Sequence, residues 1–393
     1  MREVFDSGGI RVRDGSVVDH VVADDVDTGI STRVARRHRH SGPGAPRSIR
    51  GLVGARRIAL TCLGGLLALG CSTTHAALRS PSPSTAHAAA PHAATTAPAL
   101  TSLPATSAPA TTEPVGNAYC GTRTGAPTTT KLMVVYEENH DASSIYGSSS
   151  APNIDRYAAD CGSAQNYQAL THPSLPNYMA STSGVSYASP PWTGDCDPGG
   201  NCLSGDDNIF DQVGPTGWKG YAESMTSNCQ AGSSGTYAAR HDPALYYTDV
   251  SAQCPTNDVP MGTTSSGALH TDVVDGTLPT FSTVTPNLDD DMHDGTVAQG
   301  DTWLAGWIDQ IVAGPDYRSG RLGIVVVWDE GSGDGDVASN VAMIAMSPYV
   351  VPGTRSSTYF THYSLLRAAE DVAGVPGLAG AATANSLRTA FGF

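Results

Sequence analysis

Basic residues are scarce in this chain, where 22 lysines and arginines stand against 37 aspartates and glutamates, a net charge of −15. Twelve of the basic residues, all arginines, precede Ser80, so the remainder carries ten basic and thirty acidic residues, a formal charge of −20. So acidic a domain has no basic surface for nucleic acid, and we expect no nucleic-acid partner. An anionic substrate would need local cations to offset this field, which favours a bound metal.

The N-terminal part lacks an apolar run long enough to span a bilayer comfortably. The run from Ile58 to Gly70 has the length of a signal-peptide core and follows several arginines. We therefore predict a signal peptide over residues 47–71. It ends in A-L-G-C at Cys71, which resembles a bacterial lipoprotein cleavage box, although Leu is usual where Ala68 stands. Lipidation of Cys71 and plain secretion stay as equal alternatives.

Three further segments differ in composition. Residues 1–46 show no sustained apolar period, so we interpret them as unstructured or as a mis-assigned start. Residues 72–116 are rich in Ala, Pro, Thr and Ser and have too few large apolar groups for a core, so they are a disordered linker. Residues 117–393 form the folded domain. We expect a monomer, secreted or held on a bacterial cell surface by lipidated Cys71.

The folded domain alternates buried strands with helices, which is typical of an α/β domain with a mostly parallel sheet. We predict three layers, with helices on both faces of the central sheet. Glycine, serine, aspartate and proline dominate residues 183–276, so we expect mainly loops there. The predicted strands are 131–136, 164–169, 218–223, 280–285, 322–328 and 341–347, and the predicted helices are 152–161, 174–182, 299–313 and 363–373.

The domain also lacks the closely spaced C-x-x-C pairs of common zinc sites, so zinc binding by its cysteines is disfavoured. Six cysteines follow the export signal and should be paired in an oxidising compartment. Six cysteines allow 15 connectivities. Proximity in the sequence favours the pairs Cys120–Cys161, Cys196–Cys202 and Cys229–Cys254.

The stretch T-H-P-S-L-P-N-Y, residues 171–178, places Ser174 between two prolines at the predicted start of a helix. The free N–H groups and positive dipole at a helix start favour an anion such as phosphate. Because a serine hydroxyl is a poor nucleophile at neutral pH, a partner must lower its pKa. A structural role as a helix cap is the alternative.

Acidic clusters follow three predicted strands, and the ends of parallel strands form sites at one edge of a sheet. The clusters are Glu137–Asn139, Asp289–Asp294 and Asp329–Glu330. Their oxygens suit a divalent cation, which beside Ser174 would activate the hydroxyl. Solvated surface loops are the alternative, above all for residues 289–291. His293 is a candidate proton donor to a leaving group.

Eight motifs occur in one order across residues 132–393. Together they resemble the bacterial phosphoesterase family of acid phosphatases and phosphatidylcholine-type phospholipases C, which is related to the alkaline phosphatase superfamily. The motifs are E-N-H at 138–140, A-P-N-I at 151–154, T-H-P-S-L-P-N-Y at 171–178, Y-A-E-S at 221–224, T-P-N-L with D-M-H-D at 285–294, G-P-D-Y-R-S-G at 314–320, W-D-E-G at 328–331 and T-H-Y-S-L-L-R at 361–367.

The resemblance implies an alkaline-phosphatase-like fold and a divalent metal ion of unknown identity. It implies that Ser174 is the nucleophile of a phosphoester hydrolase, with Thr171 a less favoured choice. Matching the motifs gives the metal site as Glu138, Asn139, Ser174, Asp329 and Glu330. It gives His293 and His241 as the histidines that contact the phosphoryl or leaving group, and we assign Asn139, His172, Asn177 and Asp294 to substrate binding.

One departure from the family pattern is Asn340, which stands where a histidine is expected before a strand. We therefore favour one metal over two. The expected activity is acid-phosphatase-like hydrolysis of a small phosphomonoester through a phosphoserine. A phospholipase C is one alternative, with Tyr187 and Trp192 in a lipid-head pocket. A degenerate surface binding protein is the other.

Overall fold

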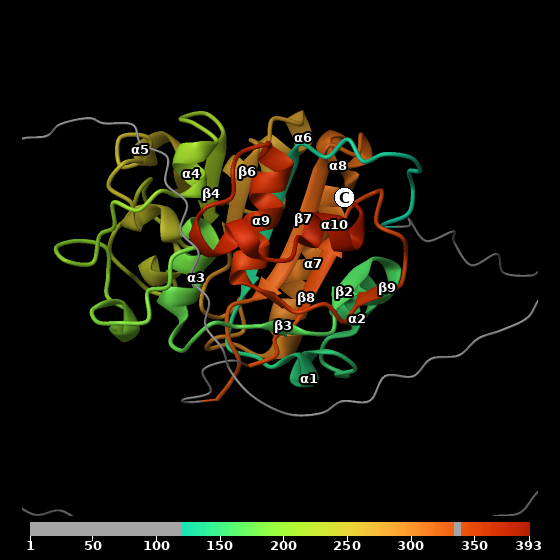
Figure 1. Ribbon diagram of the computed structural model, residues 1–393, viewed down its shortest axis with the longest axis horizontal. Helices are drawn as coiled ribbons and strands as arrows, with labels where there is room; N and C mark the ends of the chain where they lie inside the picture. Colours follow the sequence, from blue (N-terminus) through green and yellow to red (C-terminus); the bar gives the residue numbers. More distant parts are fainter. Residues whose placement is uncertain (1–118, 334–338) are drawn as a thin grey trace, which may run out of the picture. The chain divides into compact units, whose positions relative to one another are not determined.

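The computed structural model describes residues 119–333 and 339–393 (Figure 1). The predictions for residues 1–46, for the signal peptide at 47–71 with lipidated Cys71, and for the linker at 72–116 lie outside the described residues. The domain predicted from residue 117 onward is therefore described from Tyr119. None of the helices within the described ranges is long and apolar enough to cross a bilayer.

An eight-stranded sheet runs through the centre of the domain in the order β5-β4-β6-β1-β7-β8-β2-β9. Neighbouring strands are parallel except at β8, which is antiparallel to both β7 and β2. A second, two-stranded parallel sheet pairs β10 with β3. The strands are β1 (Lys131–Glu137), β2 (Gly162–Ala164), β3 (Tyr167–Gln168), β4 (Trp218–Ala222), β5 (Asp258–Pro260), β6 (Phe281–Thr285), β7 (Leu322–Trp328), β8 (Met343–Met346), β9 (Thr354–Ser356) and β10 (Phe360–Thr361).

Helices lie on both faces of this sheet, as predicted. On one face the Tyr136 hydroxyl of β1 lies 2.8 Å from the Ser181 hydroxyl of α3, and α9 packs against both α3 and β1. Figure 1 shows α9 and α10 in front of the strands. Because side chains alternate along a strand, Glu137 points to the other face, where Asp301 of α7 is among its charged neighbours.

The helices are α1 (Ala142–Ile145), α2 (Pro152–Asp160), α3 (Ser174–Ser183), α4 (Ile209–Gln212), α5 (Cys254–Asn257), α6 (Ala268–Asp275), α7 (Val297–Ala313), α8 (Pro315–Arg318), α9 (His362–Ala373) and α10 (Leu387–Phe391). Short 3-10 turns are η1 (Trp192–Gly194), η2 (Ala239–His241), η3 (Pro243–Tyr246) and η4 (Ala379–Thr383). The largest predicted helices, α2, α3, α7 and α9, are confirmed to within two residues at each end.

The central strands form because their sequences are apolar on both faces. Strand β7 (L-G-I-V-V-V-W) is buried along its whole length, with β1 and β8 on either side. Burial on both faces requires helices above and below, which is why such continuous apolar runs occur in parallel sheets. In the register, Val134 of β1 lies between Thr283 and Val325, so all three strands end at one edge.

Three predictions of elements were wrong in part. The strand predicted at 164–169 is two short strands, β2 and β3, in different sheets. The strand predicted at 218–223 is confirmed as β4, but the segment 183–276 also holds β5 and α6 besides loops, because pairing of β4 with β6 extends the sheet there. The strand predicted at 341–347 is shorter and antiparallel, since the chain returns directly beside β7.

All three predicted disulfides are confirmed: Cys120–Cys161, Cys196–Cys202 and Cys229–Cys254. The first ties the segment before β1 to the end of α2, and the second closes a loop after η1. The third anchors the segment after β4 to α5. Disulfides of this kind persist in oxidising compartments.

Candidate active site

The turn before α3 is built by Asn177, four residues into the helix. Its Oδ1 accepts the backbone N–H groups of Leu170 and Thr171 at 3.0 and 3.2 Å, and its Nδ2 donates to the Thr171 carbonyl at 2.8 Å. These three hydrogen bonds hold the backbone of residues 170 and 171 against the first turn of α3. The helix begins at Ser174, and Pro173 is its N-cap residue. Both ends of the Asn177 amide are occupied, so it shapes the turn in this structure.

Ser174 lies between two carboxylates. Its Oγ is 3.0 Å from Glu138 Oε2, after β1, and 3.3 Å from Glu330 Oε1, after β7. The residue is only 2% exposed. The sequence alone placed the two carboxylates at separate strand ends and Ser174 at a helix start, and the fold brings all three together at one edge of the sheet.

Asp329 is held beside them by backbone N–H groups. Its Oδ1 accepts from Glu330 at 2.6 Å and from Asn139 at 3.2 Å. Asn139 can donate in this way because its backbone is left-handed, with φ of 53°. Asp329 Oδ2 and Asn139 Oδ1 are buried and have no hydrogen-bond partner among the described residues.

The site concentrates negative charge in a buried place. Burial, and then the charges of Asp329 and Asp291, raise the pKa of Glu138 well above its usual value. Burial also raises the pKa of Asp329 to about 7. For Glu330, burial and the Asp329 charge raise the pKa to about 10. Without a cation these carboxyl groups cannot all be ionised together.

A divalent cation fits this donor set. Hard divalent ions bind carboxylate and amide oxygens. Asp329 Oδ2 and Asn139 Oδ1 are oxygens of these two kinds, and they have no hydrogen-bond partner among the described residues. A cation here would also offset the repulsion among the carboxylates. The residues that would hold it are those predicted from the sequence: Glu138, Asn139, Ser174, Asp329 and Glu330. The ligand assignment itself stays a prediction.

His241, predicted to contact the substrate, is buried behind Glu138 and is 0% exposed. Its Nε2 lies 3.3 Å from Glu138 Oε1 and its Nδ1 lies 3.4 Å from Asp291 Oδ2. Burial lowers the pKa of His241 well below its usual value. In this position the ring supports Glu138. The expectation that residues 289–291 are solvated is wrong for Asp291, which is 1% exposed because it faces this ring.

Tyr178 was missed by the sequence reasoning as a member of the site. It stacks on His241 with ring centroids 5.2 Å apart, and its hydroxyl donates to Glu138 Oε1 at 2.5 Å. Its position four residues after Ser174 puts it on the same face of α3, which is the signal that could have identified it.

His293 sits at the more open side, with 27% of its side chain exposed. Its Nδ1 lies 2.7 Å from Asp294 Oδ1, and its Nε2 accepts from Arg240 at 3.2 Å. Asp294 is 60% exposed and therefore orients His293 from the solvent side. Arg240 was not predicted, although it lies beside His241 in a segment rich in charge.

Another carboxylate, on Asp195, reaches the start of α3. Its Oδ1 accepts the Leu175 N–H at 3.0 Å, and its Oδ2 lies 3.8 Å from Arg240 Nε. The predicted anion-binding end of the helix is therefore occupied by a side chain of the protein itself.

The remaining predicted residues lie around this centre. His172 Nδ1 is 2.8 Å from Glu330 Oε1. The Thr171 hydroxyl donates to the His172 carbonyl at 3.2 Å. His362, which was not predicted, lies 2.6 Å from the Asp329 carbonyl, and burial lowers its pKa to about 4. Asn340 accepts the Tyr167 N–H at 3.0 Å and so has a structural contact.

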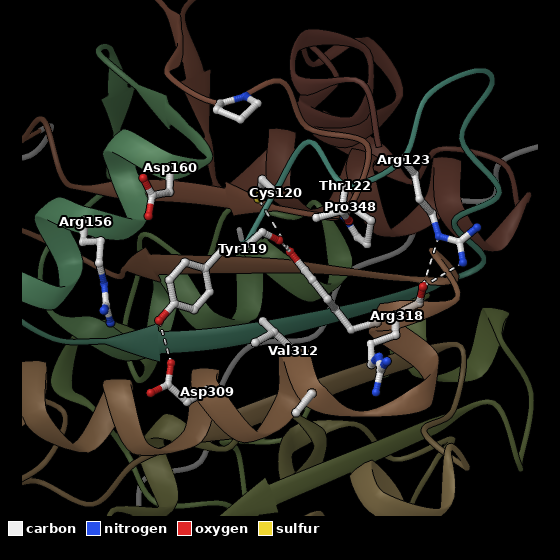
Figure 2. Close-up of a pocket in the computed structure, with 13 residues that line it drawn as sticks. Tyr119, Cys120, Thr122, Arg123, Arg156, Asp160, Asp309, Val312, Arg318 and Pro348 are labelled. Carbon is white, nitrogen blue, oxygen red and sulfur yellow. Dashed lines mark hydrogen bonds between the residues drawn. The ribbon is translucent and has the colours of Figure 1, made fainter. Parts of the chain in front are cut away.

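A groove of about 1140 Å³ lies elsewhere in the domain (Figure 2). Its lining includes Tyr119, Arg156 and Asp309, where the Tyr119 hydroxyl donates to Asp309 at 2.7 Å. These residues precede β1, β2 and β7 in the chain, so the groove is at the opposite ends of the strands from Ser174. It contains none of the predicted site residues.

Comparison with known proteins gives relatives in sequence and in structure. The chain is 32% identical over 255 residues to a phosphatidylinositol-3-phosphatase of Mycobacterium tuberculosis, covering 64% of this chain and 79% of that protein. It is 26% identical over 254 residues to a probable acid phosphatase of Kluyveromyces lactis, covering 61% of this chain and 57% of that protein. The fold is also similar to a solved structure of a protein in the alkaline phosphatase superfamily from Vibrio parahaemolyticus. That match covers 69% of this chain and 74% of the other chain, with 10% sequence identity and a TM-score of 0.48.

A family model matches residues 134–376, which include every residue of the candidate site. Both ends of the match lie within the folded domain, from β1 to beyond α9. The chain belongs to the Phosphoesterase family.

Proposed function

We propose that this chain is a metal-dependent phosphomonoesterase that uses Ser174 as its nucleophile. The observation that carries the proposal is the position of Ser174 Oγ, 3.0 Å from Glu138 and 3.3 Å from Glu330, at the first residue of α3. Membership of the Phosphoesterase family makes the chain a hydrolase of phosphoric ester bonds. The names of its relatives are those of phosphatases, which supports a monoester substrate.

A divalent cation held by Glu138, Asp329 and Glu330 would supply a lower pKa for the Ser174 hydroxyl and positive charge for the phosphoryl oxygens. The hydroxyl already points at carboxylate oxygens, which take its proton as the Oγ–P bond forms. Once Asp195 no longer occupies the Leu175 N–H, the helix start provides backbone N–H groups for the oxygens that gain charge.

Departure of the alcohol needs a proton, because an alkoxide is a poor leaving group. His293 is partly exposed and oriented by Asp294, and its Nε2, once Arg240 no longer donates to it, is the atom that delivers this proton. The P–O bond to the alcohol breaks, and the phosphoryl group is left on Ser174. Water then attacks the phosphoserine and gives one proton back to His293, while the carboxyl group returns its proton to the Ser174 oxygen as the Oγ–P bond breaks and inorganic phosphate leaves.

His241 and Tyr178 act through Glu138. His241 is buried between Glu138 and Asp291, and Tyr178 donates to the Glu138 oxygen that Ser174 does not use. Contacts of this kind orient a ligating carboxylate and hold its charge. We therefore assign both residues a positioning role.

The phospholipase C alternative placed Tyr187 and Trp192 in a lipid-head pocket. These rings pack against each other edge to face, with centroids 4.6 Å apart, and the Tyr187 hydroxyl donates to Asp206 at 2.7 Å. Tyr187 is 6% exposed, so it contributes to the packing of its loop and offers little surface to a lipid.

One panel of substrates tests the proposal. Purified protein is assayed on p-nitrophenyl phosphate, bis(p-nitrophenyl) phosphate and p-nitrophenyl phosphorylcholine, before and after chelation and after return of divalent cations. We expect the monoester to be preferred and its hydrolysis to require metal. Preference for phosphorylcholine would support the phospholipase alternative. No hydrolysis by metal-replete protein would support the degenerate binding protein.

The chain's location is a further part of the proposal. Three disulfides fit folding in an oxidising compartment, which is consistent with export. We propose a secreted or surface-held enzyme of a bacterium, with lipidation of Cys71 as the means of attachment. Mass spectrometry of the exported product would show whether Cys71 carries a lipid.

A further inference from the structure

Asp195 belongs to a loop that is separate from α3 in the sequence, yet its side chain caps that helix. It follows η1 directly and has a left-handed backbone, with φ of 48°. The neighbouring disulfide Cys196–Cys202 closes the same loop. Its Oδ1 accepts the N–H of Leu175, the residue after the nucleophile, at 3.0 Å.

The second oxygen of Asp195 faces a cation. Its Oδ2 lies 3.8 Å from Arg240 Nε, and about a quarter of each side chain is exposed. Arg240 also donates from its Nη2 to His293 Nε2. The Asp195 carboxylate therefore accepts a hydrogen bond from the start of α3 and also forms an ion pair with an arginine of the proposed active site.

These two donors are the kind that bind phosphoryl oxygens. Helix N-termini present backbone N–H groups to phosphate, and arginine pairs with it through charge-assisted hydrogen bonds. A phosphorus atom bonded to Ser174 Oγ would bring its other oxygens next to the Leu175 N–H. In this structure that N–H is already taken, and Ser174 is 2% exposed.

We propose that Asp195 is an internal competitor of the substrate, which holds the phosphate subsite until a phosphoryl group displaces it. The inference rests on the proposed function, because it concerns the phosphate subsite of the same site. Rotation of one side chain clears the Leu175 N–H. A phosphoryl group that draws Arg240 to itself also frees His293 Nε2 to face the leaving group. The negative charge of Asp195 opposes anion binding both before and after its side chain rotates.

Binding of inorganic phosphate tests this inference without turnover. The dissociation constant is measured by calorimetry for the full chain as purified and for Asp195→Asn and Asp195→Ala. Both variants should bind phosphate about tenfold more tightly, because the competing charge is gone. The matched control is Asp197→Asn in the same disulfide loop, whose carboxylate accepts from Ser233 at 3.2 Å and should leave the affinity unchanged.

Unchanged or weaker phosphate binding in Asp195→Asn would overturn the inference and leave Asp195 as a helix cap alone. Thermal unfolding checks that the variants are folded, and Asp195→Asn keeps an acceptor for Leu175 if Asp195→Ala loses stability. The two proposals fail separately. Tighter phosphate binding in a protein without phosphatase activity would support the competitor and refute the enzyme, whereas an active enzyme with unaltered phosphate binding would do the reverse.

Discussion

Ser174 and Tyr178 lie one turn apart on α3 and both donate to Glu138, Ser174 to one carboxylate oxygen and Tyr178 to the other. A residue and its neighbour four positions on share a helix face, so a single helix presents both donors to the end of β1. Glu138 is fully buried, and these two hydrogen bonds fix the position of its carboxylate.

Ser174→Ala should lower kcat for p-nitrophenyl phosphate by about 1000-fold or more, because the proposed nucleophile is lost. Metal content and thermal stability should stay near those of the parent protein. Thr171→Val is the matched comparison, since Thr171 is the less favoured nucleophile and its hydroxyl bonds only a backbone carbonyl in this structure. Activity that survives in the first variant and vanishes in the second would transfer the role to Thr171.

Tyr178→Phe should weaken metal binding about tenfold while kcat at saturating metal changes little. The hydroxyl orients Glu138 and does not contact the reacting atoms, and such supporting contacts typically influence metal affinity on this scale. Titration of the metal-free protein by calorimetry gives the affinity. Tyr136→Phe is the control, because its hydroxyl meets Ser181 on the same face of the sheet. Equal effects of the two changes would show that Tyr178 matters only for packing.

The stability of the metal-free protein should fall as the pH rises. Burial raises the pKa values of Asp329 and Asp291 to about 7, whereas the pKa of an aspartate in an unfolded chain is about 4. Between these values the unfolded chain releases protons that the folded protein retains, so folding is favoured at low pH and this contribution is lost by about pH 7. With chelator present, Tm should be higher at pH 5 than at pH 8.

Divalent cations should remove most of that difference by stabilising the ionised carboxylates, with an increase in Tm at pH 8 of about 5 °C or more. Thermal scans at the two pH values, with and without metal, provide the measurement. The variant Asp329→Asn should lose most of the response to metal. A Tm that metal leaves unchanged at pH 8 would contradict a cation site among these carboxylates.

His293→Gln should slow phenyl phosphate hydrolysis by about 100-fold and p-nitrophenyl phosphate hydrolysis much less. A poor leaving group needs the proton that His293 supplies, whereas p-nitrophenolate leaves without one. The dependence of kcat on the pKa of the leaving group is the measurement. His270→Gln on α6 is the control, since its ring contacts Gln310 and the Thr264 carbonyl away from the site. A uniform loss across leaving groups would assign His293 to substrate binding.

The sequence by itself determined the class of fold and the chemistry of the centre. The run from Leu322 to Trp328 is apolar throughout, so it must be buried on both faces, and this fixes a covered, mostly parallel sheet. Acidic residues directly after such strands must meet at one edge, because parallel strands end together. The prolines on either side of Ser174 correctly predicted that a helix begins at this residue. The disulfide pairs followed from proximity along the chain.

Only the tertiary structure decided which side chains approach Ser174 from other elements, and in what role. Asp291 lies in a run of acidic residues that favours a solvated loop, yet His241 covers it, and that contact depends on how the segment after β4 packs. Asp195 and Arg240 meet at the start of α3 from loops about 20 and 65 residues downstream. Contacts between distant segments depend on where each element packs on the sheet, and no local pattern of residues records that position.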